Sequence, residues 1–230
     1  MNEFSDFTIA DRPAVSLQIY QYLKQAIISC KLEPGRAISE KEIASSMNVS
    51  RQPVREAFIQ LAKCSLVRVY PQRGTYVTQI SIKSVMDGQL IRSSLESALI
   101  GRLTASISAE QIEFLSYLLT QQQHAIDTQN YQLFLHHDDA FHHQLALAAD
   151  CPLAWDTIET VKAVMDRVRY LDLTRESTME QVLVEHQAII DALASKDAEK
   201  AQTLIQQHLN DFPQVMESIR ERYPDWFAEQ

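Results

Sequence analysis

The sequence predicts a mainly helical protein, with a small head of helices and one hairpin followed by an all-helical bundle. Three observations support this fold class. Glycine is scarce, with 4 in 230 residues, and apolar residues at helical spacing fill most of the chain. Residues 67–80, VRVYPQRGTYVTQI, instead have the pattern of two strands around a turn. Charge also divides the chain: residues 1–80 hold 10 basic and 7 acidic residues, whereas the remainder holds 11 and 23.

The head is predicted to contain three helices before the hairpin. SLQIYQYLKQAIISC (16–30) places its apolar residues at helical spacing. Ser39, with Glu42 three residues later, has the pattern of a capping box for a short second helix, and Ser50 is positioned to cap a third. Helix, helix, turn, helix and a two-stranded wing are the order of a winged helix-turn-helix.

The remainder is predicted to form a second, all-helical domain of six helices. We expect the first domain to span residues 1–79 and the second to span residues 80–230. Ser108 and Ser177, each followed three residues later by Gln or Glu, supply capping signals for two of the helices. The predicted helices of the bundle span residues 83–103, 109–127, 130–149, 153–172, 178–194 and 197–222.

The third helix of the head carries the residues expected to read DNA. Recognition helices place their first residues on base edges, and arginine is the usual partner of guanine. The polar residues in the first turn and a half are Ser50, Arg51, Gln52 and Arg55. The residues predicted to face the core are Val54, Phe58, Ile59 and Leu61. At the wing tip, Arg73 and Gly74 are placed to meet the minor groove or a phosphate. The alternative is a solvated helix face, although arginine near a helix start opposes the macrodipole.

In the segment HHDDAFHHQLALAAD (136–150), rotational phase separates the polar residues. Each helical residue turns roughly 100°, so with Phe134 at zero Asp138 lies near ~40° and His142 near ~80°. Both therefore share the apolar stripe of the helix, whereas His143 lies on the opposite side. The residues predicted to be solvated are His136, Asp139 and His143.

Two later helices each turn one further histidine, His186 and His208, toward their apolar stripes. Burying three histidines and a carboxylate in one interior costs several kcal/mol unless something pairs them. A divalent metal ion would do so through nitrogen and oxygen ligands, with zinc expected first and nickel, iron or manganese as alternatives. Asp138 and His142 are four residues apart, so one helix can supply two adjacent ligands.

The stretch SEKEIASSMNVSRQPVREAFIQLAKCSLVRVYPQRGTYV resembles the winged-helix head of GntR-superfamily regulators. The helical remainder is similar to the effector domain of FadR-type members, which has the FCD fold. The resemblance implies a homodimer that represses a catabolic, sugar-acid-related operon and reads near-palindromic double-stranded operator DNA. It implies DNA contacts at Lys41, Ser50, Arg51, Gln52, Arg55, Arg73 and Gly74. It implies metal ligation by an Asp-x3-His pair and two later histidines, here Asp138, His142, His186 and His208.

Some members of the family capture a small carboxylate effector at the metal, and a cation would help to position such an acid. Arg92 in the first bundle helix is the first candidate, followed by Arg167 and Arg169. Arg92 also has an ordinary interpretation as an i,i+4 salt bridge to Glu96.

Two other classes of function remain open at this point. A metal-dependent hydrolase would use the same ligands, but a general base is not evident, because Glu185 and Asp139 both lie off the stripes. We therefore do not expect an enzyme. The other alternative is a DNA-binding dimer whose bundle has a purely structural role.

Composition indicates the compartment. The three cysteines, Cys30, Cys64 and Cys151, are widely spaced and are expected to be unpaired buried thiols in a reducing cytoplasm. No apolar run approaches the ~18 residues of a membrane helix, and the acidic N-terminus lacks a signal pattern. We expect a cytoplasmic protein with no membrane partner.

Overall fold

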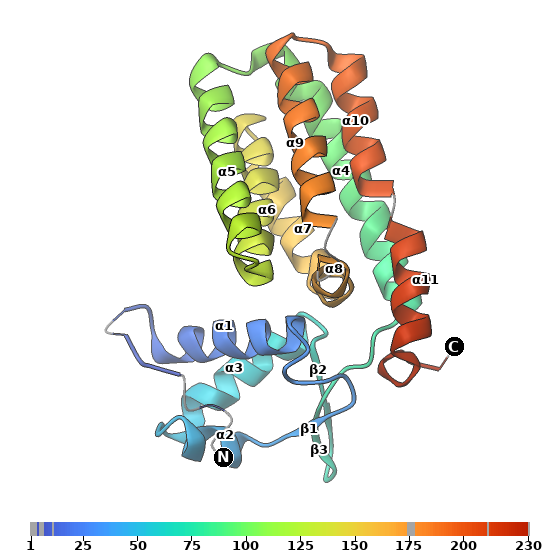
Figure 1. Ribbon diagram of the computed structural model, residues 1–230. Coiled ribbons are helices and arrows are strands. Elements are labelled where there is room, and N and C mark those ends of the chain that lie inside the picture. The colour runs from blue at the N-terminus through green and yellow to red at the C-terminus, as the bar shows by residue number, and fades with distance from the viewer. Residues whose placement is uncertain (1–3, 5–6, 11, 174–177, 211, 230) are drawn as a thin grey trace. The chain divides into compact units, whose positions relative to one another are not determined.

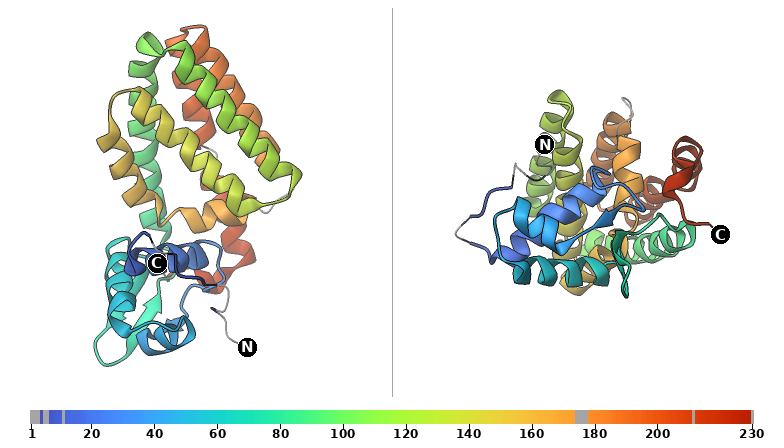
Figure 2. Two further views of the ribbon diagram at one scale, coloured as in Figure 1. Left: turned by 90° about the vertical axis from the view of Figure 1, so that its left-hand side faces the viewer. Right: turned by 90° about the horizontal axis from the view of Figure 1, so that it is seen from below.

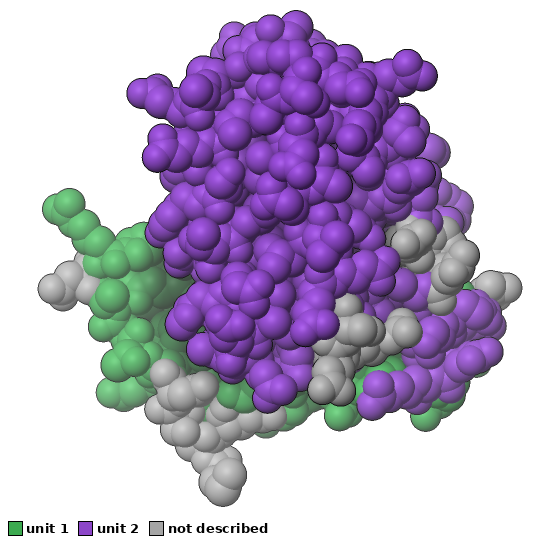
Figure 3. All heavy atoms as spheres, turned by 45° about the horizontal axis from the view of Figure 1, so that its top comes forward, with its two compact units in different colours: residues 1–82, 223–230 green, residues 83–222 purple. Residues whose placement is uncertain are grey.

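The chain divides into two compact units in the computed structural model (Figure 3). Unit 1 runs to Ile82 and also includes the segment from Tyr223 onward, whereas unit 2 spans Lys83–Arg222. The boundary that we expected between residues 79 and 80 thus lies close to the first junction, but the return of the C-terminal segment to unit 1 had no signal in the sequence. The structure describes residues 4, 7–10, 12–173, 178–210 and 212–229.

Unit 1 packs three helices against a small antiparallel sheet with strand order β1-β3-β2. Helix α3 packs against both α1 and α2. In the wing, Val67 lies opposite Val77 and Tyr70 lies opposite Gly74, as the hairpin pattern predicts. The two-residue strand β1 was not predicted, because so short a segment shows no alternation. The elements are α1 (Val15–Ile28), β1 (Ala37–Ile38), α2 (Glu40–Ser46), α3 (Arg51–Lys63), β2 (Val67–Tyr70) and β3 (Gly74–Val77).

The serines predicted to cap helices differ in whether they form the capping hydrogen bond. Ser39 and Ser50 occupy the N-cap positions of α2 and α3, but neither side chain makes the predicted capping hydrogen bond. Ser108 forms a complete capping box, because its Oγ accepts from the Gln111 N–H at 3.2 Å while Gln111 Oε1 accepts from the Ser108 N–H at 2.9 Å. Ser177 lies outside the described residues.

Unit 2 is an all-helical bundle (Figures 1 and 2). Helix α5 lies beside α6 and α9, and α9 lies beside α10. The predicted helix 153–172 is divided into α7 and α8 at residues 163–165; the sequence presented it as one helix because the apolar spacing continues across the break. The predicted helix 197–222 corresponds to α10 and α11, and residue 211 between them lies outside the described residues. The helices are α4 (Ile82–Ser106), α5 (Ala109–Asp127), α6 (Tyr131–Ala148), α7 (Pro152–Lys162), α8 (Asp166–Leu173), α9 (Thr178–Ala194), α10 (Ala198–Asn210) and α11 (Phe212–Arg222).

Each unit has its own apolar core, and the core of unit 2 surrounds the polar residues of α6. The fully buried Phe134 and Phe141 of α6 flank Asp138 along the helix, which places this aspartate in the bundle interior. Each of the three cysteines is half-buried, whereas the sequence predicted buried thiols. Within the described residues, no helix combines the length and the apolarity that a membrane crossing requires.

Candidate metal centre and DNA-reading unit

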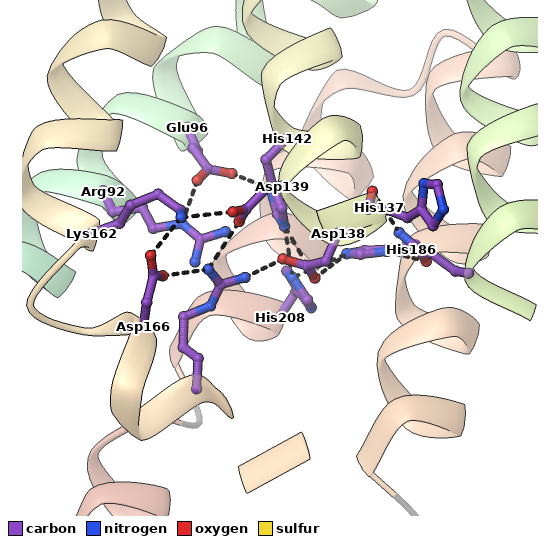
Figure 4. A network of polar contacts seen from close by, with 12 residues as sticks. Arg92, Glu96, His137, Asp138, Asp139, His142, Lys162, Asp166, His186 and His208 are labelled. Carbon is purple, nitrogen blue, oxygen red and sulfur yellow. Dashed lines mark hydrogen bonds and ion pairs between the residues drawn. The ribbon is translucent and has the colours of Figure 1, made fainter. Parts of the chain in front are cut away.

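Four side chains of unit 2 direct one donor atom each toward a common point (Figure 4). Asp138 and His142 come from α6, His186 from α9 and His208 from α10. Their donor atoms all lie within 4.8 Å of one another. His208 Nε2 is 3.3 Å from the Nε2 atoms of both His142 and His186. Asp138 Oδ1 is 3.7 Å from His186 Nε2 and 3.9 Å from His142 Nε2. The structure thus brings together all four residues that the sequence selected.

The opposite nitrogen of each imidazole is held by an acceptor from a neighbouring helix. His142 Nδ1 lies 2.5 Å from Glu96 Oε2, and His208 Nδ1 lies 2.7 Å from Glu185 Oε2. His186 Nδ1 lies 3.0 Å from Gln122 Oε1. An ionised carboxylate and an amide oxygen can only accept, so these histidines donate through Nδ1–H. Sequence reasoning missed all three acceptors, because each acts on a histidine from another helix.

Burial favours the neutral form of two of the histidines. Burial lowers the pKa of His142, although Glu96 opposes the shift. Burial also holds the pKa of His186 well below its ordinary range, and the adjacent His208 and His142 add to this effect. A neutral imidazole has one N–H, and here it is engaged at Nδ1. The Nε2 lone pairs of His142 and His186 therefore point at the common centre without a proton between them.

This donor set fits a divalent transition metal. Around an ion with bonds of about 2.0–2.1 Å, neighbouring donors lie roughly 3.0–3.4 Å apart. The two Nε2–Nε2 distances of 3.3 Å match that spacing, and Asp138 Oδ1, at 3.7 and 3.9 Å from two of the nitrogens, lies a few tenths of an ångström beyond it. Hydrogen-bonded partners on the far nitrogens are the usual outer support of histidine ligands, because they fix the tautomer and the ring orientation.

Arg92 is joined to the ligands through Glu96. Its Nε donates to Glu96 Oε1 at 2.6 Å, which is the i,i+4 pair that the sequence suggested, and both side chains are buried. Burial alone would raise the pKa of Glu96, but Arg92 and His142 outweigh it and hold this pKa well below its usual range. Glu96 thus stays ionised and links an arginine to a histidine ligand.

A second polar network continues from Asp138, and it corrects the prediction for Asp139. Asp139 is not solvated: Lys162 Nζ donates to it at 2.8 Å and Arg169 Nη1 at 3.1 Å. The same two cations bond Asp166, and Arg169 also donates to Asp138 Oδ2. Burial would raise the pKa of Asp139, but Lys162 and Arg169 hold it well below its usual range. The phase of α6 is as predicted; α7 and α8 cover the side that was expected to face water.

The remaining predicted residues divide between exposed and packed positions. His136 is exposed as expected, whereas His143 is half-buried and stacks on Trp155 with ring centroids 5.0 Å apart. Arg167 is fully buried at 1 % exposure. Glu185 does lie away from His186, but it accepts from His208 and so belongs to the centre that it was expected to avoid.

The candidate DNA residues of unit 1 are all exposed. Arg51 and Arg55 project from the first turns of α3, where Glu40 of α2 lies 3.7 Å from Arg51 and 3.4 Å from Arg55. Gln52 donates to Glu56 at 3.0 Å. Gly74 has a φ of +103°, a conformation that favours glycine at the tip of the wing. Ile59 faces outward at 51 % exposure, so its assignment to the core was wrong.

A helix-turn-helix unit with a wing, joined to a helical unit that encloses a polar centre, is the organisation of a two-domain transcriptional regulator. Comparison with known families gives the same class. Residues 15–77 match the model described as bacterial regulatory proteins, gntR family, and residues 89–211 match the FCD domain. The chain belongs to the GntR family of regulators and carries an FCD domain. Members of this family are transcriptional regulators and not enzymes.

Individual relatives extend over nearly the whole chain. The chain is 42% identical over 216 residues to the HTH-type transcriptional repressor RspR of Escherichia coli K12, which covers 94% of this chain and 95% of the relative. It is 26% identical over 201 residues to a probable D-xylose utilization operon transcriptional repressor of Paenarthrobacter nicotinovorans, with 86% and 87% covered. The solved structure of E. coli McbR/YncC superposes with a TM-score of 0.77 at 19% identity, covering 92% of this chain and all of that one.

Proposed function

We propose that this protein is a dimeric, FadR-type repressor of a catabolic operon, and that its bundle binds a divalent metal ion and a small carboxylate effector. The repressor assignment is supported by the names of the relatives, one of which concerns sugar utilisation. Zinc is the metal that we expect first, followed by nickel, iron and manganese. The convergence of three histidines and Asp138 is the observation that carries the metal proposal.

The effector would enter where the ligand set meets buried cations. Asp138 presents Oδ1 to the histidines, while Arg169 holds Oδ2. Arg169 bonds three carboxylates and Arg92 bonds a fourth, so an effector carboxylate would share or replace one of these partners. Four protein ligands leave two positions on a six-coordinate ion and none on a tetrahedral one. The coordination number therefore decides between a sensing and a structural role of the metal.

Regulation would follow from differential affinity. An effector changes the population of two conformations only if it binds one of them more tightly. In a dimer, a change in the bundle would alter how two recognition helices match half-sites about one DNA turn, or a multiple of it, apart. We propose that Lys41, Ser50, Arg51, Gln52, Arg55, Arg73 and Gly74 form the DNA contacts.

Metal binding is tested by titrating Zn²⁺, Ni²⁺, Mn²⁺ and Fe²⁺ into EDTA-treated protein by calorimetry. We expect one site per chain, and we expect His186→Ala to lower the affinity by at least about 100-fold, because even loss of an outer partner costs 10–100-fold. His136→Ala is the matched control, since His136 lies on the same bundle but is exposed. Equal affinities of the two variants would exclude the site.

The sensing role is tested on the metal-loaded protein with gluconate and glucuronate as probes. Binding of either acid that requires the metal and is weakened by Arg92→Gln supports an effector site at the centre. A metal that binds tightly, with operator affinity unchanged by every acid, would favour the structural-only bundle.

DNA reading is tested with duplexes selected from a random library. Arg51→Ala should weaken binding to the selected sequence by ~1–3 kcal/mol and relax its specificity, because a base-edge contact is lost. Lys63→Ala removes the same charge from the other end of α3 and serves as the control. If both variants lose the same affinity for all sequences, Arg51 contributes charge only and its assignment to base reading is wrong.

A further inference from the structure

The C-terminal segment is bonded to the residues that lead out of the wing. The Ile80 N–H donates to the Trp226 carbonyl at 2.8 Å, and the Ile80 carbonyl accepts from the Ala228 N–H at 3.0 Å. These bonds form a parallel bridge between Ile80 and Phe227. The Gln79 amide adds a bond to the Asp225 carbonyl at 3.0 Å. Ile80 is fully buried and Phe227 is 6 % exposed, so both partners of the bridge bury apolar side chains.

This contact joins the two places where the chain passes between its units. Ile80 lies two residues before the start of α4, and the segment from Tyr223 directly follows α11. The first and the last helix of the bundle therefore both continue into the same small bridge in unit 1. Any change in the separation between the start of α4 and the end of α11 must act on this bridge.

The elements next to the end of the chain are also tied to the metal-ligand set. Helix α11 packs against α8 and buries Met216 and Ile219. Helix α8 carries Arg169, which bonds the ligand Asp138. Helix α10, which precedes α11, carries the ligand His208. A rearrangement at the centre therefore reaches α11 through α8 and along the chain from α10.

We propose that residues 223–229 act as a strap that transmits the state of α8 and α11 to the exit of the wing at residues 78–80. That a bound ligand drives the strap rests on the function proposed above, but the mechanical link between α11 and Ile80 does not. The strap works by pairing: the tail holds Ile80 through two backbone bonds and one buried aromatic side chain, so displacement of α11 displaces Ile80. A tail that merely covers Ile80 would stabilise it without transmitting anything.

The two roles are separated by amide hydrogen exchange at Thr78, whose N–H donates to the Leu66 carbonyl at the base of the wing. Ile219→Ala loosens α11 without touching the ligands. Ala228→Pro removes the N–H that bonds Ile80, and the extended Phe227 before it suits a following proline. Phe227→Ala is a second way to open the strap, and Glu229→Ala, at an exposed position, is the control.

We expect Ile219→Ala to raise exchange at Thr78 severalfold when the tail is intact or carries Glu229→Ala. With Ala228→Pro or Phe227→Ala present, Ile219→Ala should add nothing at Thr78, because coupled sites are non-additive. An equal effect of Ile219→Ala with and without the intact strap, or no effect in either background, would overturn the proposal.

A second hydrogen-exchange experiment uses Zn²⁺ alone as the ligand, and calorimetry checks independently that Zn²⁺ binds. Zn²⁺ should change exchange in α8 and at Thr78 in the natural chain, and in α8 alone in Ala228→Pro. A change at Thr78 that survives Ala228→Pro contradicts the strap. If Zn²⁺ does not bind, the metal proposal fails, and the Ile219→Ala comparison decides the strap by itself.

Discussion

Two lysine–aspartate pairs in unit 2 have the same i,i+4 spacing and opposite surroundings. Lys162 and Asp166 are 2.8 Å apart with side chains 3% and 2% exposed, whereas Lys83 and Asp87 are 2.5 Å apart with side chains 84% and 58% exposed. Lys162 also bonds Asp139, so its removal would leave the buried Asp166 and the half-buried Asp139 each short of a cation. We expect Lys162→Met to lower the free energy of unfolding by about 3–5 kcal/mol.

The matched variant Lys83→Met should change the free energy of unfolding by at most about 0.5 kcal/mol, because an exposed pair is screened by solvent. Urea denaturation followed by Trp155 fluorescence measures both variants in the same unit. Similar losses for Lys83→Met and Lys162→Met would mean that the buried network contributes no more than a surface ion pair.

At the scale of the element, helix α6 shows how much of the centre the sequence could predict. A periodicity of 100° per residue placed Asp138 and His142 on the apolar side, and both are buried, at 4% and 1% exposure. The same reasoning applied to the later helices selected His186 and His208. Rotational phase is a property of one helix, so a single segment of sequence was sufficient to predict it.

The environment of α6 could not be predicted in the same way, because it depends on which helices cover the other side. Asp139 and His143 were expected to be solvated, but Lys162 and Arg169 bond the first and Trp155 stacks on the second. These partners come from α7 and α8, which the sequence presented as one helix. The acceptors Glu96 and Gln122 were missed for the same reason, since each meets its histidine only in the folded bundle.

At the scale of the whole molecule, the division into a basic head and an acidic bundle was readable from charge, whereas the return of the C-terminal segment was not. That segment bonds Ile80 through two backbone hydrogen bonds. Any residue except proline can form such bonds, so the amino-acid sequence does not predict this contact. The winged helix was more accessible, because its order of elements and its wing turn depend on local sequence.

The two tryptophans report the two units separately, since Trp155 lies in α7 of unit 2 and Trp226 in the C-terminal segment of unit 1. A ligand that binds only the native state stabilises it by about 2.7 kcal/mol at 100 times its dissociation constant. We expect Zn²⁺ at that excess to raise the free energy of unfolding by this amount when unfolding is followed by Trp155 fluorescence in Trp226→Phe. EDTA should abolish the effect. The free energy of unfolding reported by Trp226 in Trp155→Phe should rise less, because unit 1 contains none of the four ligands. Unit 1 gains stability only through the strap. A Trp155 shift that persists in His186→Ala would place the metal outside the Asp138–His142–His186–His208 centre, whereas equal shifts of both signals would mean that the two units unfold as one.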